Sequence, residues 1–245
     1  MRAFIILFTF FSAFFVSSAF PNEIDDNVNL CMNGDSKSCL LATDYLLDKI
    51  NIGEVSNNEE QILNLLFKSC KLGEACSCER VANLYYSGEF VNIDLKKVLE
   101  AEELGCKLNN TQSCVNIAEE YSKGINRKKD HLKAYKYYTK SCDLNHGESC
   151  NIAAIYNNTL TGFKDFPKGF SNHKLAAKFY RRGCKLKSAY SCRNLAVSYL
   201  LGYGVKVSRE SAIANYKLAI KYGYTSGVDK KVQLQDLGFT INLDD

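Results

Sequence analysis

Eleven cysteines are the residues of this 245-residue chain whose type and spacing are best suited to chemistry. Zinc ligands are typically separated by about two to four residues, but ten of these cysteines form Cys-x7-Cys pairs and no Cys-x-x-Cys redox motif occurs. The three histidines, at positions 131, 146 and 173, are scattered and complete no metal cluster. The pattern therefore predicts structural disulfides, with no metal and no cofactor. The predicted pairs are Cys31–Cys39, Cys70–Cys78, Cys106–Cys114, Cys142–Cys150 and Cys184–Cys192.

The eleventh cysteine, Cys76, lies two residues before Cys78 and has no partner in this scheme. We interpret it as an alternative partner for Cys70 or simply as a free thiol candidate. The other interpretation is an intermolecular or exchange-competent cysteine in an exposed turn.

The first nineteen residues resemble a targeting segment rather than part of a fold. Arg2 is followed by an almost unbroken apolar run, residues 4–16, and then by the small residues Ser17, Ser18 and Ala19. The run is shorter than the roughly 20 residues that span a bilayer, which favours a signal peptide cleaved near Ala19 over a membrane anchor. We expect an exported chain, periplasmic or secreted, with residues 20–245 forming one domain that has no membrane span. The formal net charge of +4 is too small to indicate a nucleic-acid partner.

Two helices in each repeat must position the cysteines. Apolar or small residues three, four and seven positions after the second cysteine of a pair trace one face of a helix, and a glycine ten positions after it (Gly88, Gly124 or Gly202) predicts where that helix ends. Apolar or aromatic residues eight and four positions before the first cysteine of a pair, such as Ala134 and Tyr138, predict a second helix. With a period near 36 residues, the sequence predicts an all-α, right-handed solenoid of about five disulfide-linked helix pairs, closed by a capping helix over about 226–237. Three phenylalanines in the long loop 161–170 are expected to cover a helix end.

The segment from Cys192 to Gly223 resembles a Sel1-like repeat, a relative of the tetratricopeptide repeat. The matching residues are Leu195, Ala196, Tyr199, Gly202, Gly204, Val205, Ala212, Tyr216, Ala219 and Gly223. With the cysteine pairs and the signal peptide, the chain from Cys31 to about Leu237 is similar to the Helicobacter cysteine-rich protein family. That resemblance implies two possible functions. One is β-lactam hydrolysis with penicillin binding, and the other is action on host cells as a secreted factor.

Catalytic residues for β-lactam hydrolysis are not evident in the sequence. Serine β-lactamases combine Ser-x-x-Lys with Ser-Asp-Asn and Lys-Thr-Gly motifs, and only the first occurs, from Ser171 to Lys174. Ser171 is more simply explained as the N-cap of a helix that begins there. Weak β-lactam hydrolysis or penicillin binding is therefore the alternative function, with β-lactams as its ligands.

Binding by a scaffold is the function that we favour. First helices of such solenoids usually line the concave face, and there we expect polar ligand contacts from Arg80, Asn83, Asn116, Arg193 and Asn194. Amide and guanidinium groups can hold a peptide backbone or a terminal carboxylate, although each residue alone could equally belong to a solvated helix face. The expected ligand is a peptide, a protein or a peptidoglycan-like glycan in the concave groove.

Overall fold

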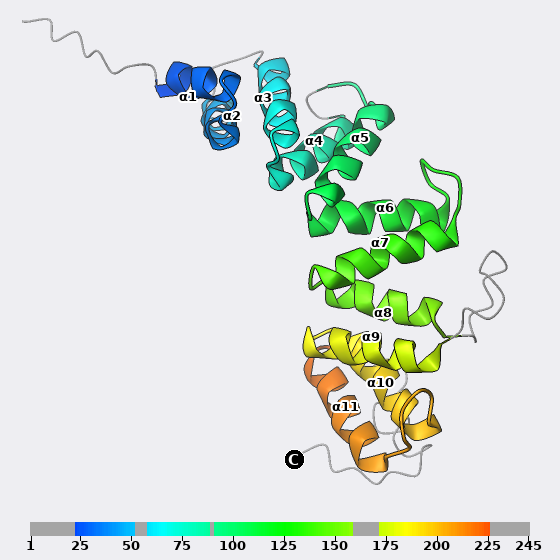
Figure 1. Cartoon of the computed structure of the whole chain (residues 1–245). Coiled ribbons are helices and arrows are strands. Elements are labelled where there is room, and N and C mark those ends of the chain that lie inside the picture. Colours follow the sequence, from blue (N-terminus) through cyan, green and yellow to red (C-terminus); the bar gives the residue numbers. More distant parts are fainter. Residues whose placement is uncertain (1–22, 52–57, 89–90, 159–171, 226–245) are drawn as a thin grey trace, which may run out of the picture.

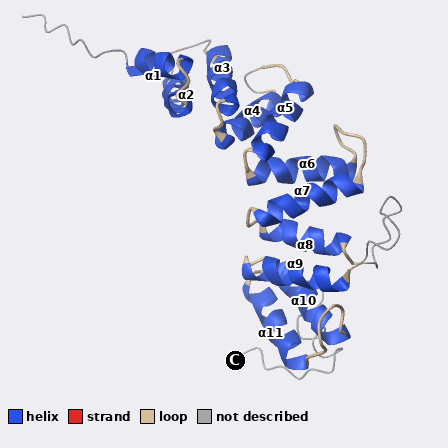
Figure 2. Cartoon of the chain, viewed as in Figure 1, coloured by secondary structure: helices blue, strands red, loops and turns tan. Residues whose placement is uncertain are grey.

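The protein is an all-α solenoid, as the repeat pattern predicts. The computed structural model describes residues 23–51, 58–88, 91–158 and 172–225, and within these ranges it contains eleven helices and no strand (Figures 1 and 2). The helices are α1 (Glu23–Met32), α2 (Ser36–Asn51), α3 (Glu59–Lys71), α4 (Ala75–Ser87), α5 (Leu95–Lys107), α6 (Thr111–Lys123), α7 (His131–Asp143), α8 (Gly147–Tyr156), α9 (His173–Lys185), α10 (Ala189–Leu201) and α11 (Arg209–Lys221). The predicted signal peptide, the loop with three phenylalanines and the predicted capping helix lie outside the described residues.

The helices stack along an arc, and each packs mainly on its neighbours in the sequence. The first helices of the repeats are α2, α4, α6, α8 and α10, and the second helices are α3, α5, α7, α9 and α11. In the view of Figure 1, the short turns that lead from a second helix into the next first helix lie on the inner side of the arc. The fully described longer connections, between α6 and α7 and between α10 and α11, lie on its outer side.

Helix boundaries follow from capping residues in the sequence. The first helices α4, α6 and α10 end at glycines with left-handed backbone, at φ angles of 70°, 75° and 74° for Gly88, Gly124 and Gly202, which confirms the predicted stops. At seven helix starts, the side chain of the N-cap residue accepts a hydrogen bond from a backbone N–H of the first turn. These N-cap residues are Asp94, Asn110, Asp130, His146, Asn172, Ser188 and Ser208. The N-cap prediction for Ser171 is wrong by one residue, because Asn172 caps α9 and accepts from the backbone N–H of Leu175 at 3.0 Å.

All five Cys-x7-Cys pairs form disulfides, with Cα–Cα distances from 4.5 to 4.7 Å. Each joins the end of one helix to the start of the next, and none of the ten cysteines is more than 6% exposed. Cys76 is a free and exposed thiol in the first turn of α4. The disulfides are thus part of the core, and each lies where two repeats meet.

The helices cross closely at the four disulfides from Cys70 to Cys192, because the residue before each bonded cysteine there is serine or glycine. Ser77 donates to Ser69 across one crossing at 2.8 Å, and Ser149 donates to Ser141 across another at 3.0 Å. At a third crossing Gly105 faces Ser113, whose buried Oγ has no hydrogen-bond partner among the described residues. A Cβ on Gly105 would clash with that Oγ and would lie 3.0 Å from Cys78 Cβ. At these crossings the small side chains therefore let the two helices approach.

Gly105→Ala should lower the free energy of unfolding by about 2 kcal/mol, the order of an overpacked core site. Ser113→Ala alone should be nearly neutral, since it removes a hydroxyl that makes no hydrogen bond. The double variant should recover at least half of the loss, as measured in a double-mutant cycle by denaturant unfolding of the oxidised protein. Additive effects of the two substitutions would contradict a steric clash at this crossing.

Removing one disulfide with Cys142→Ala and Cys150→Ala should destabilise the protein by about 2 kcal/mol, because a short loop then becomes free in the unfolded chain. Thermal unfolding followed by circular dichroism measures the change. Cys76→Ala is the matched control and should leave the melting temperature unchanged, because the Cys76 thiol is exposed and unpaired. An equal melting temperature for the disulfide variant would show that this bond does not stabilise the repeat junction.

Candidate functional site

A cavity of about 290 Å³ is formed by α4, α5, α6 and the loop that follows α6. Drug-sized ligands usually occupy roughly 300–1,000 Å³, so this cavity has room for one side chain or a small molecule. It brings together residues that lie as far apart in the sequence as positions 82 and 126. Its lining consists of Ala82, Asn83, Tyr86, Val98, Glu102, Asn116, Glu119, Glu120, Lys123, Ile125 and Asn126.

Glu102 occupies a core position of its repeat. It lies four residues before Cys106, where the equivalent residues of other repeats are apolar or aromatic and buried: Leu66, Tyr138, Tyr180 and Tyr216. The Glu102 side chain is also buried, with only 5% exposed, and its Oε2 atom has no hydrogen-bond partner in the part of the chain that the structure describes. A buried carboxylate without a full set of partners is costly, so this residue is the least expected member of the cavity lining.

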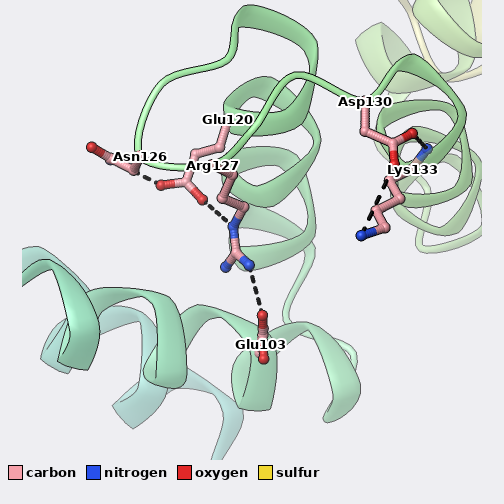
Figure 3. Close-up of polar contacts among 6 residues, drawn as sticks. All are labelled: Glu103, Glu120, Asn126, Arg127, Asp130 and Lys133. Atoms are coloured by element: carbon pink, nitrogen blue, oxygen red, sulfur yellow. Dashed lines mark hydrogen bonds and ion pairs between the residues drawn. The ribbon is translucent and has the colours of Figure 1, made fainter. Parts of the chain in front are cut away.

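The second buried carboxylate, Glu120, is fully engaged (Figure 3). Asn126 donates to its Oε1 at 3.0 Å, and Arg127 Nε donates to its Oε2 at 2.6 Å. Arg127 also binds Glu103 through Nη1 at 2.6 Å, so one guanidinium joins α5 to α6. The positive charge of Arg127 is thereby shared between two carboxylates, neither of which is Glu102.

The surroundings of Glu102 shift its pKa strongly. Burial raises the pKa of Glu102 to about 7, and repulsion from Glu120 acts in the same direction, whereas a hydrogen bond from Asn116 and the charge of Arg127 partly oppose it. Burial lowers the pKa of Arg127, but its ion pairs with Glu103 and Glu120 outweigh this and raise it. Near neutral pH, therefore, Glu102 exchanges a proton while Arg127 stays charged.

Of the five predicted ligand contacts, Asn83 and Asn116 line this cavity. Asn116 Oδ1 accepts a hydrogen bond from Gln112 at 2.8 Å, which leaves the N–H groups of the Asn116 amide available as donors.

The other three predicted contacts lie away from the cavity. Arg80 is paired with Asp44 of the preceding first helix at 2.7 Å. Asn194 donates to Asn151 at 2.9 Å and accepts from Arg193 at 2.9 Å. The pairs Arg80–Asp44 and Asn194–Asn151 join neighbouring first helices, whereas the junction between α4 and α6 contains the cavity.

Our sequence predictions did not include Glu102 or Glu120. The position of Glu102 is a readable signal, since the same position is apolar or aromatic in α3, α7, α9 and α11. Nothing comparable distinguishes Glu120, because its environment depends on Asn126 and Arg127 in the loop after α6.

The other chemical motifs of the sequence do not gather into a site among the described residues. Lys174 borders a separate hollow whose described lining contains no serine, and Ser171 is outside the described residues. The described residues contain no group of three or more histidine, cysteine, aspartate or glutamate side chains that could hold a metal ion. No helix described in the structure is both long and apolar enough to cross a membrane.

Comparison with protein families identifies Sel1 repeats in the chain. The Sel1 repeat model matches residues 111–146, 161–188 and 189–224, which include α6 with α7, and α10 with α11. A comparison with curated proteins finds no match. The chain therefore contains Sel1 repeats in its C-terminal half.

Solved structures with the same fold include a Sel1 repeat protein from Oxalobacter formigenes, with a TM-score of 0.64 and 17% identity over 88% of this chain and 60% of that one. A second is the protective antigen c5321 of uropathogenic Escherichia coli, with a TM-score of 0.53 and 14% identity over 82% of this chain and 49% of that one. The chain thus spans less than two thirds of either protein. Helicobacter pylori cysteine rich protein B matches at a TM-score of 0.40 and 22% identity, over 53% of this chain and 90% of that protein.

Glu102→Leu should remove the part of the pH dependence of stability that Glu102 causes. Between pH 5 and pH 8, the free energy of unfolding should therefore fall less in the variant than in the parent. The folded-state pKa of about 7 exceeds the ordinary value of 4.5, so the stabilising contribution of Glu102 is present below pH 4.5 and is lost as pH rises through 7. Between pH 5 and 8 this loss should be about 2 kcal/mol in the parent and absent in the variant. Urea unfolding at both pH values measures it. Glu100→Leu, at an exposed position of the same helix, should keep the pH dependence of the parent.

Proposed function

We propose that this protein is an exported Sel1-repeat scaffold that binds a peptide segment of a partner in the cavity between α4 and α6. The observation that carries this proposal is the pair of amide side chains, Asn83 and Asn116, which come from consecutive first helices and line one cavity. At the α2–α4 junction the corresponding side chains, Asp44 and Arg80, bind each other, and at the α8–α10 junction Asn194 is bonded to Asn151.

A peptide fits the chemistry of this lining. Each amide side chain offers both donors and an acceptor, which match the N–H and C=O groups of a peptide bond. The cavity volume of about 290 Å³ accommodates one side chain beside that backbone, rather than a large rigid ligand. Stacked helix pairs commonly present such extended surfaces to partners.

Export is supported by the cysteine chemistry. Structural disulfides persist in oxidising compartments and are rare in reducing ones, and this chain contains five of them in its core. The basic and then apolar composition of residues 1–19 supports the same proposal. We do not extend the proposal to β-lactam hydrolysis, because no observation on the described residues favours it.

Asn116→Ala should weaken peptide binding about tenfold without lowering the melting temperature, because Asn116 contacts the cavity and its hydrogen bond with Gln112 is exposed. Peptides are first selected from a random library on the oxidised protein, and their affinities are then measured by calorimetry. Asn194→Ala is the matched control and should keep the affinity, since Asn194 is already bonded to Asn151. Equal affinities for the parent and Asn116→Ala would contradict the proposed site.

A further inference from the structure

We infer that the cavity between α4 and α6 recognises a protonated primary amine, such as that of a peptide lysine, and that Glu102 provides the opposite charge. This inference rests on the proposed peptide-binding function and names the chemistry that it selects. The ligand contacts the carboxyl group of Glu102, whose buried Oε2 atom has no hydrogen-bond partner among the described residues.

The balance of charges around the cavity leaves one negative group without a cation. Glu103 and Glu120 share Arg127, and Glu119 is paired with Lys123. Glu102 is the remaining carboxylate, and its polar neighbours include Glu120, Asn116 and Arg127, whose buried Nη2 also lacks a hydrogen-bond partner among the described residues. A monovalent cation bound in the cavity would give the Glu102 carboxylate the opposite charge that the fold itself does not provide.

The shape of the site favours an ammonium group over other cations. The small volume of the cavity, about 290 Å³, suits a compact ammonium better than the broad planar fork of a guanidinium. The side-chain oxygen of Asn83 is a second acceptor in the lining, and the ring of Tyr86 lines the same cavity and can receive a cation on its face. A divalent metal would need more ligands than the described carboxylates bring together.

Binding of the amine is coupled to loss of a proton. A protonated Glu102 must release its proton to solvent when it pairs with the ammonium, which keeps all of its own protons. The charged or titratable groups around it are Tyr86 on α4, Glu103 on α5, Arg127 in the loop, and Glu119, Glu120 and Lys123 on α6. Because burial places the pKa of Glu102 at about 7, affinity should rise with pH up to that value and then level off.

The test uses the oxidised protein and n-butylammonium, with n-butanol as its neutral analogue, in isothermal titration calorimetry. Butylammonium should bind at least about fivefold more tightly at pH 7.5 than at pH 5.5, and butanol should bind at least about tenfold more weakly than butylammonium at pH 7.5. Titrations at pH 6 in two buffers with different ionisation enthalpies should show release of close to one proton per amine bound. Equal binding of the amine and the alcohol would overturn the inference.

Substitutions assign the effect to Glu102. Glu102→Gln keeps the size of the side chain and should abolish both amine binding and proton release; Glu102→Leu, which gives the residue found at position 66, should do the same in a stably folded protein. Glu100→Gln on the same helix is the matched control and should behave like the parent. Unchanged amine binding in a folded Glu102 variant would overturn the inference.

A peptide comparison separates this inference from the proposed function. Library-selected peptides containing lysine are compared with the same peptides acetylated at the lysine Nζ, and acetylation should cost at least about tenfold in affinity. If peptides bind in an Asn116-dependent manner but acetylation has no effect, the scaffold proposal stands and the amine inference is overturned. If butylammonium binds through Glu102 but no peptide binds, the amine site stands and the peptide proposal fails.

Discussion

The close crossing of two helices at each repeat junction is the constraint on which the rest of this solenoid depends. A disulfide joins the helices there, and at four of the five junctions serine or glycine immediately before both bonded cysteines lets the backbones approach. In a stack whose units contact mainly their neighbours, each junction must be stable by itself, because there is no single central core to compensate for a weak one. The sulfur atoms and the small side chains provide that stability locally.

This local stability explains how the fold tolerates a carboxyl group in its interior. Glu102 occupies a position that is filled by Leu66 or by tyrosines in other repeats, and it lies only four residues before the disulfide-bonded Cys106. Buried ionisable groups are usually destabilising and are often found where a protein binds or reacts. Here Arg127 holds α5 and α6 together around the cavity by pairing with Glu103 and Glu120, so the cavity does not collapse onto Glu102.

Much of the architecture could be predicted from the sequence, because its signals are local. The spacing of cysteines, the glycine stops such as Gly124 and the apolar marks at helical spacing each involve residues within one or two turns of one another. The site could be predicted only in part. Asn83 and Asn116 were recognised as polar positions on first helices, but which polar side chains pair across a junction depends on how neighbouring repeats stack. The pairing of Arg80 with Asp44, 36 residues away, is such a case. Asn172 rather than Ser171 caps α9 because capping depends on the residue at which the backbone turns into the helix.

The short distance in sequence between bonded cysteines also bears on how the chain acquires its disulfides. A chain that enters an oxidising compartment from its N-terminus exposes each first cysteine together with its native partner before the cysteines of the next repeat arrive. Short loops close at low entropic cost, so correct pairing is favoured by order of arrival as well as by the final structure. Cys76 is the exception, because it follows Cys70 by six residues and arrives before Cys78. The second junction is therefore the one place where the nearest available partner is the wrong one, and where a bond formed first between Cys70 and Cys76 would need thiol–disulfide exchange to reach the native bond.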